Sequence, residues 1–97
     1  MIAEIVTFDL PAGMTQAELM EKYNATVPRW RANRDLIRKT YVYDKETNRG
    51  GGIYLWKTKD AALKAHNAEW CQMAEDMYGS APRFEYFDAM FVIDNGV

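Results

Sequence analysis

The sequence has little cysteine and no long apolar run. Cys71 is the one cysteine, so an intrachain disulfide and a CxxC-type metal cage are both excluded. No stretch approaches the roughly 18 apolar residues that a membrane-spanning helix needs. Residues 1–5 also lack the basic start and long apolar run of a signal peptide. We therefore expect a cytoplasmic protein with no membrane partner.

The sequence also lacks an excess of positive charge. Twelve basic and fourteen acidic residues are interspersed and give a formal net charge of -2. Proteins that bind nucleic acid usually concentrate basic residues on one surface. We therefore expect no nucleic-acid partner.

Apolar residues are plentiful for so short a chain. The 97 residues fit a single domain, residues 1–97, and 48% of them are hydrophobic and 13% aromatic. A domain of this size buries only roughly 60–65% of the surface that its unfolded chain exposes. Some apolar surface must therefore face a partner or line a pocket.

Hydrophobic periodicity predicts strands and two helices in alternation. Thr15 and Glu18 form a capping-box pattern at the start of the first helix, and Pro28 predicts a kink or a break near its end. The second helix is expected to begin at Asp60 and to end near Tyr78, before Gly79. The strands are expected at residues 2–10, 36–44, 51–57 and 84–93.

This order predicts an α+β fold with a ferredoxin-like β-α-β-β-α-β plan and a four-stranded antiparallel sheet. Both helices would cover one face of the sheet. The last strand, residues 84–93, is apolar on both of its faces. A sheet with one solvated face should alternate instead. We therefore expect a homodimer in which two sheets pack face to face.

The central segment resembles a known family. Residues 36–42, a polar turn, the run Gly50-Gly51-Gly52-Ile53-Tyr54-Leu55-Trp56, and residues 60–63 are similar to the YdhR mono-oxygenase family. That family belongs to the antibiotic-biosynthesis monooxygenase superfamily of dimeric α+β barrels. The resemblance implies a homodimer with a hydrophobic cavity in each subunit. It also implies oxygen addition to an aromatic or quinol-like substrate without metal or organic cofactor.

Such chemistry requires an aromatic pocket, a base, and donors that stabilise an anion. Aromatic side chains combine a large apolar area with a polar group, which suits the binding of a planar ligand. They are also typical of a core or a dimer interface. The substrate-binding candidates on the two hairpin strands and the second helix are Tyr41, Tyr43, Tyr54, Trp56 and Trp70. Strand parity alone leaves open which sheet face the strand residues occupy.

His66 is the single histidine and lies on the apolar stripe of the second predicted helix. Imidazole is a natural general base near neutral pH, although a hydrogen-bonded histidine at the boundary of helix and sheet is the more common occurrence. Asp88 interrupts the last strand and is either a base or a partner of an ion pair. The run of glycines at 50–52 enters a strand and not a helix, so it predicts close backbone approach and not a phosphate site.

The sequence therefore predicts a cofactor-independent monooxygenase with His66 as the base and a small hydrophobic or aromatic ligand. Two alternatives stay open. One is a non-catalytic dimeric module that binds a small ligand, and the other is an isomerase or cyclase on the same scaffold.

Overall fold

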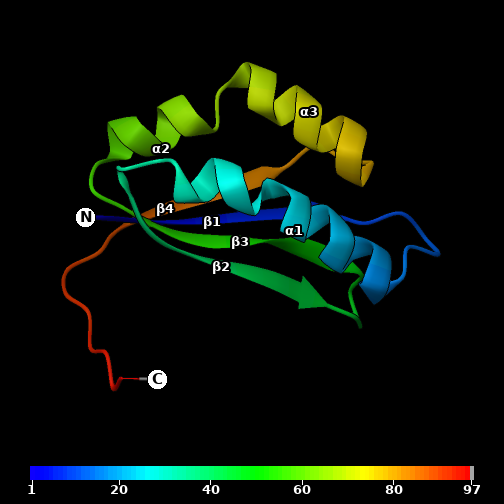
Figure 1. Ribbon diagram of the computed structural model, residues 1–97, viewed down its shortest axis with the longest axis horizontal. Coiled ribbons are helices and arrows are strands. Elements are labelled where there is room, and N and C mark those ends of the chain that lie inside the picture. The colour runs from blue at the N-terminus through cyan, green and yellow to red at the C-terminus, as the bar shows by residue number, and fades with distance from the viewer. Residues whose placement is uncertain (97) are drawn as a thin grey trace.

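The computed structural model describes residues 1–96. Seven elements follow one another along the chain, in the order β-α-β-β-α-α-β (Figure 1). Their bounds are β1 Ile2–Asp9, α1 Gln16–Arg31, β2 Leu36–Asp44, β3 Arg49–Trp56, α2 Lys59–Ala65, α3 Ala68–Tyr78 and β4 Arg83–Asp88.

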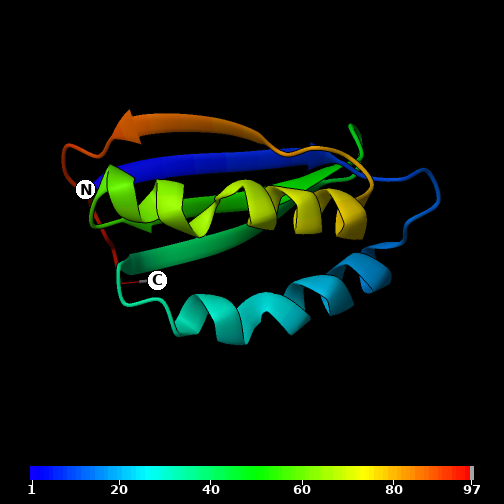
Figure 2. The ribbon, with the colours of Figure 1, turned by 90° about the horizontal axis from the view of Figure 1, so that it is seen from above.

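The four strands form one antiparallel sheet in the order β2-β3-β1-β4. All three helices lie on the same face of this sheet, with α1 toward β2 (Figures 1 and 2). The predicted α+β, ferredoxin-like architecture is therefore confirmed. No helix within residues 1–96 is long and apolar enough to cross a membrane.

Strand alternation decides which side chains face the helices. In β1 these are Glu4, Val6 and Phe8, all buried, and in β3 they include Tyr54 and Trp56. The opposite face carries Ile5 and Ile53, which are paired across the two strands. Tyr54 and Trp56 thus lie in the layer between helices and sheet.

The last strand is shorter than predicted. β4 ends at Asp88, which pairs with Ile2, and the backbone N–H of Ala89 donates to the Met1 carbonyl oxygen. Because β1 begins there, no neighbouring strand remains for residues 90–93. These residues leave the sheet as an extended tail on the helix-free side (Figure 1).

The second predicted helix is in fact two helices. The Thr58 side chain caps α2, so the expected cap at Asp60 is wrong, and α2 ends at Ala65. Asn67 caps α3 by accepting from the Trp70 N–H, 2.9 Å away. A second cap directly after His66 makes a break there favourable. His66 therefore occupies the junction and not a helical stripe.

The first helix agrees better with its sequence pattern. Its Thr15 cap accepts from the Glu18 N–H at 3.1 Å, as predicted. The helix continues through Pro28 to Arg31 without the expected break into two helices. Pro28 has no N–H to donate within the helix, but its carbonyl oxygen still accepts from the Ala32 N–H at 3.1 Å, so the last turn is kept.

Candidate functional site

A carboxylate is completely buried between the helices and the sheet. Glu4 Oε1 accepts from Trp56 Nε1 at 2.8 Å, and His66 Nδ1 lies 2.8 Å from Oε1 and 2.9 Å from Oε2. The helix break brings His66 to this position. Because Glu4 engages Nδ1, the other ring nitrogen, Nε2, is free to act as an acceptor. Nε2 is buried and has no hydrogen-bond partner within the described chain.

Aromatic rings surround the imidazole. The centroid of the His66 ring lies 4.3 Å from that of Trp70, 4.7 Å from that of Tyr54 and 5.3 Å from that of Trp30. Phe84 closes a further side at 5.6 Å. The Glu4–His66 pair is therefore enclosed by apolar ring surface, where electrostatic interactions are stronger than in water.

Lys39 of β2 contacts two of these rings, Trp30 and Tyr54, and also the ring of Tyr41. Its Nζ lies 4.0 Å from the ring centroid of Tyr41, 4.4 Å from that of Trp30 and 4.6 Å from that of Tyr54. Burial lowers the pKa of Lys39 to about 7, while the Glu4 carboxylate acts in the opposite direction. The ring faces also attract the ammonium form. Because burial is the largest effect and brings the pKa to about 7, a substantial fraction of this amine is unprotonated at neutral pH.

The lowered pKa gives a stability prediction. Below pH 7 both folded and unfolded chains protonate Lys39, so the full cost of burying the charge is present. Between pH 7 and the ordinary lysine pKa the unfolded chain binds more protons, and wild-type stability rises with pH. The fall of the Lys39 pKa from 10.5 to about 7 sets an upper limit of about 5 kcal/mol on this cost, since each pKa unit corresponds to about 1.4 kcal/mol. Because methionine also loses the contacts between the ammonium and the ring faces, a Lys39→Met variant should gain about 2 kcal/mol of unfolding free energy at pH 6.

Urea unfolding of both proteins at pH 6, 8 and 10 measures this gain, which should shrink steadily with pH. Lys45→Met changes an exposed lysine in the turn and serves as the control. A Lys39→Met variant that is less stable than wild type at every pH would show that the charge is not buried at a cost.

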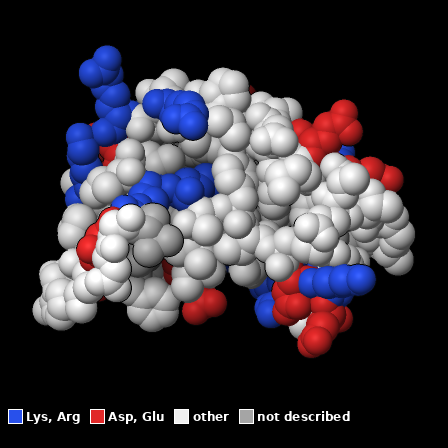
Figure 3. Space-filling view, turned by 60° about the horizontal axis from the view of Figure 1, so that its bottom comes forward, with Lys and Arg blue, Asp and Glu red and all other residues white. Residues whose placement is uncertain are grey.

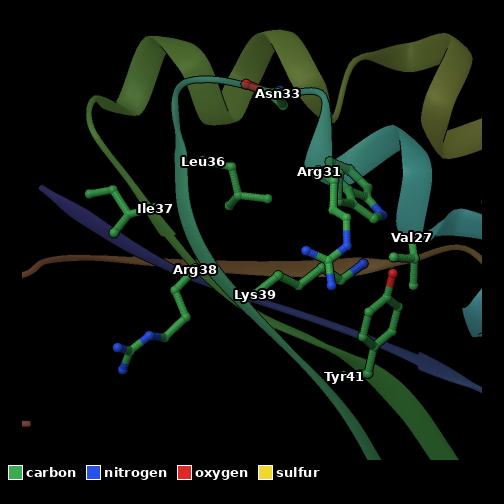
Figure 4. A pocket seen from close by; sticks show the side chains of 9 residues that line it. Val27, Arg31, Asn33, Leu36, Ile37, Arg38, Lys39 and Tyr41 are labelled. Atoms are coloured by element: carbon green, nitrogen blue, oxygen red, sulfur yellow. The ribbon is translucent and has the colours of Figure 1, made fainter. Parts of the chain in front are cut away.

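An open pocket of about 510 Å³ lies where the end of α1 meets β2 (Figure 4). This volume is in the usual range for small-molecule sites. Lys39 and Trp30 line both this pocket and a small inner cavity of about 20 Å³. The Tyr41 hydroxyl is held by Thr26 Oγ1 at 2.7 Å. The lining residues are Val27, Trp30, Arg31, Asn33, Leu36, Ile37, Arg38, Lys39 and Tyr41.

The residues predicted from the sequence occupy different parts of this region. Tyr41 lines the open pocket, whereas Tyr54 and Trp70 line the inner cavity. Tyr43 lines a separate depression of about 170 Å³ beside α1. Trp56 is fully buried and donates to Glu4, and His66 lies behind the pocket wall. Asp88 ends β4 as an exposed residue away from this cluster.

Sequence reasoning missed Glu4, Lys39 and Arg31. For Glu4 the signal was present, because it shares the parity of Ile2, Val6 and Phe8 in an apolar strand. A carboxylate at a core-facing position requires a buried partner. For Lys39 no such signal exists, since a lysine in a hairpin strand is ordinarily exposed.

No family model matches the sequence, and no curated protein matches it either. Solved structures with the same fold do exist. One is SnoaB, a cofactor-independent oxygenase from Streptomyces nogalater, with a TM-score of 0.68 and 16% identity over 95% of each chain. Another is the ActVA-Orf6 monooxygenase of Streptomyces coelicolor in complex with nanaomycin D, with a TM-score of 0.69 and 17% identity over 95% of this chain and 89% of that one.

A third similar structure comes from Bordetella bronchiseptica, and its assignment as an antibiotic biosynthesis monooxygenase is provisional. Its TM-score is 0.71, with 17% identity over 93% of this chain and 97% of that one. Identities this low establish a common fold. They do not transfer an activity.

Proposed function

We propose that this protein is a cofactor-independent monooxygenase that acts on a small aromatic compound with an ionisable proton. The observation that carries the proposal is the Lys39 amine, with its pKa of about 7, on the wall of an aromatic-lined pocket. The fold shared with a cofactor-independent oxygenase supports the reaction class.

The chemistry begins with removal of a proton from the aromatic substrate. The neutral amine of Lys39 accepts this proton and becomes an ammonium ion beside the substrate anion. The anion then transfers one electron to O₂, and the resulting radical and superoxide combine to form a C–O bond. The ammonium of Lys39 returns a proton to this peroxide, and the O–O bond breaks with loss of water, so that one oxygen stays on the ring as a carbonyl. A cation that forms next to the reacting anion stabilises both the anion and the developing peroxide.

His66 is a second candidate for the base. Glu4 holds its Nδ1, so Nε2 is available, but Trp30 and Tyr54 separate the imidazole from Lys39 and the pocket. We assign the first proton transfer to Lys39 because it lines the pocket. The Glu4–His66 pair is proposed to supply the negative charge behind the rings, which keeps the pKa of Lys39 from falling further.

Oxygen uptake with dithranol, an anthrone, tests the reaction. We expect consumption that rises with pH through about 7, because the unprotonated amine is the active form. Lys39→Met and Lys39→Arg should each lower the rate of oxygen uptake by about 100-fold or more, since neither residue supplies a base at this pH. Lys45→Met should retain wild-type activity.

The His66→Asn variant separates the two candidate bases. Asparagine keeps a donor toward Glu4 but has no Nε2, so activity within a few-fold of wild type would exclude His66 as the base. A loss as large as that of Lys39→Met would assign the proton transfer to His66 instead.

A module that only binds ligands is the second candidate function. The inner cavity of about 20 Å³ has room for little more than one water, and His66 does not line it. Absence of uptake with every anthrone and quinol, together with ligand-induced increases in melting temperature, would favour this function and contradict the monooxygenase.

We further propose that the protein is a homodimer whose subunits pair through the helix-free sheet face. Ile53 and Phe87 are 45% and 52% exposed on this face, and the tail exposes Phe91 and Ile93 at 78% each. Apolar patches of this kind mark interaction sites.

Sedimentation should give about twice the 11.2 kDa of one chain, and Ile53→Asp should shift the species to monomer. A wild-type monomer at micromolar concentration would contradict the dimer.

A further inference from the structure

The open pocket differs in charge from the protein as a whole. The chain carries a formal net charge of -2, yet the nine lining residues include Arg31, Arg38 and Lys39 and no Asp or Glu. Figure 3 shows basic side chains gathered around a hollow on this face. A concave surface lined by one sign of charge attracts ligands of the opposite sign.

Two of these cations converge. Arg31, at the end of α1, and Lys39, from β2, extend toward each other inside the pocket, whereas Arg38 points away from it (Figure 4). Arg38 pairs with Asp94 of the tail at 2.9 Å. Within residues 1–96 neither Arg31 nor Lys39 forms an ion pair. Two basic side chains that converge in a pocket lined by no acidic residue leave a site for an anion.

Flat ring surfaces stand beside the two cations. Trp30 and Tyr41 line the same pocket, and each ring lies within 4.4 Å of the Lys39 amine when measured from its centroid. Planar rings suit an aromatic ligand. A guanidinium recognises a carboxylate through two parallel hydrogen bonds, and an ammonium adds a point charge.

We propose that the substrate is an aromatic carboxylate, whose carboxylate binds Arg31 and accepts an N–H from Lys39 while its ring lies against Trp30 and Tyr41. The neutral amine of Lys39 keeps N–H donors as well as a lone pair, so it can hold the carboxylate and still accept the substrate proton. This assignment rests on the proposed function, because it names the substrate class for the same pocket. It adds a carboxylate to the small hydrophobic or aromatic ligand that the sequence predicts.

Isothermal titration with naphthalene-2-carboxylate and naphthalene-2-carboxamide tests the proposal, because the two probes share a ring system and differ in charge. At pH 6, where Lys39 is mainly protonated, the carboxylate should bind at least about tenfold more tightly. Arg31→Gln and Lys39→Met should each remove most of that preference, and Lys39→Arg should keep it. Arg34→Gln, outside the pocket lining, is the matched control and should leave the preference unchanged.

Equal binding of the two probes, or no binding of either, would overturn the proposal. A preference that survives both Arg31→Gln and Lys39→Met would do the same, since the carboxylate would then bind elsewhere. Circular dichroism of each variant excludes loss of fold as the cause. Dithranol carries no carboxylate, so its oxidation tests the monooxygenase independently of this result.

Discussion

Replacing Glu4 with leucine should lower the free energy of unfolding by about 3–5 kcal/mol. Leucine fills a similar volume but accepts no hydrogen bond, so the Trp56 Nε1–H and the His66 Nδ1 would both lose their partner. Both groups are buried among aromatic rings, where water cannot replace the carboxylate. Removal of one member of a buried polar network costs this much because the remaining members stay desolvated.

Glu4→Gln is the matched variant. Its amide oxygen can accept from Trp56, and its NH₂ can donate to Nδ1 if the His66 proton moves to Nε2. We therefore expect Glu4→Gln to lower the free energy of unfolding by only about 1 kcal/mol. Urea unfolding of the two variants measures the difference, and Glu85→Leu on the exposed part of β4 controls for the loss of a carboxylate. If Glu4→Leu and Glu4→Gln are equally stable, the network does not stabilise the fold.

Gly51→Ala should strongly lower the free energy of unfolding. Gly51 has a φ of +154°, and a Cβ there would overlap the backbone carbonyl oxygen of Val6 on the neighbouring strand. Backbone atoms of a central strand cannot rotate away, so β1 and β3 would have to separate. The Gly51 N–H also donates to the Tyr23 hydroxyl at 2.8 Å, a link between sheet and helix that the same shift would break.

We expect a loss of about 4 kcal/mol or more, in a class of proteins whose total stability is typically 5–15 kcal/mol. Gly13→Ala separates backbone strain from steric overlap, because Gly13 has a φ of +91° but open space around it. Gly13→Ala should lower the free energy of unfolding by only about 1–2 kcal/mol. A Gly51→Ala protein with the wild-type urea midpoint would refute the close approach of the two strands.

The fold was predictable because its signals are local. Alternation placed the strands, the Thr15–Glu18 cap placed the first helix, and the glycines at 50–52 correctly indicated close backbone approach. The end of β4 was not predictable in this way. Residues 90–93 have the composition of a strand, but their pairing depends on where β1 begins, which is a tertiary fact.

The site was less predictable than the fold. The substrate-binding candidates from the sequence were Tyr41, Tyr43, Tyr54, Trp56 and Trp70. All but Trp56 line a pocket or cavity, and their role in substrate binding stays a prediction. Lys39 could not be found, because only the packing of α1 against β2 surrounds its amine with rings. The role of Trp56 as a hydrogen-bond donor likewise depends on Glu4, 52 residues away in sequence.

The proposed function depends on one property, an amine at the pocket wall that is partly neutral at physiological pH. Nuclear magnetic resonance of protein with ¹³C- and ¹⁵N-labelled lysine, with the Lys39→Arg spectrum to assign the signal, follows this amine through a pH titration. We predict a midpoint at about pH 7 for Lys39. A midpoint at the ordinary lysine pKa, near 10.5, would contradict the account, because Lys39 would then be fully charged and unable to accept a proton from a substrate.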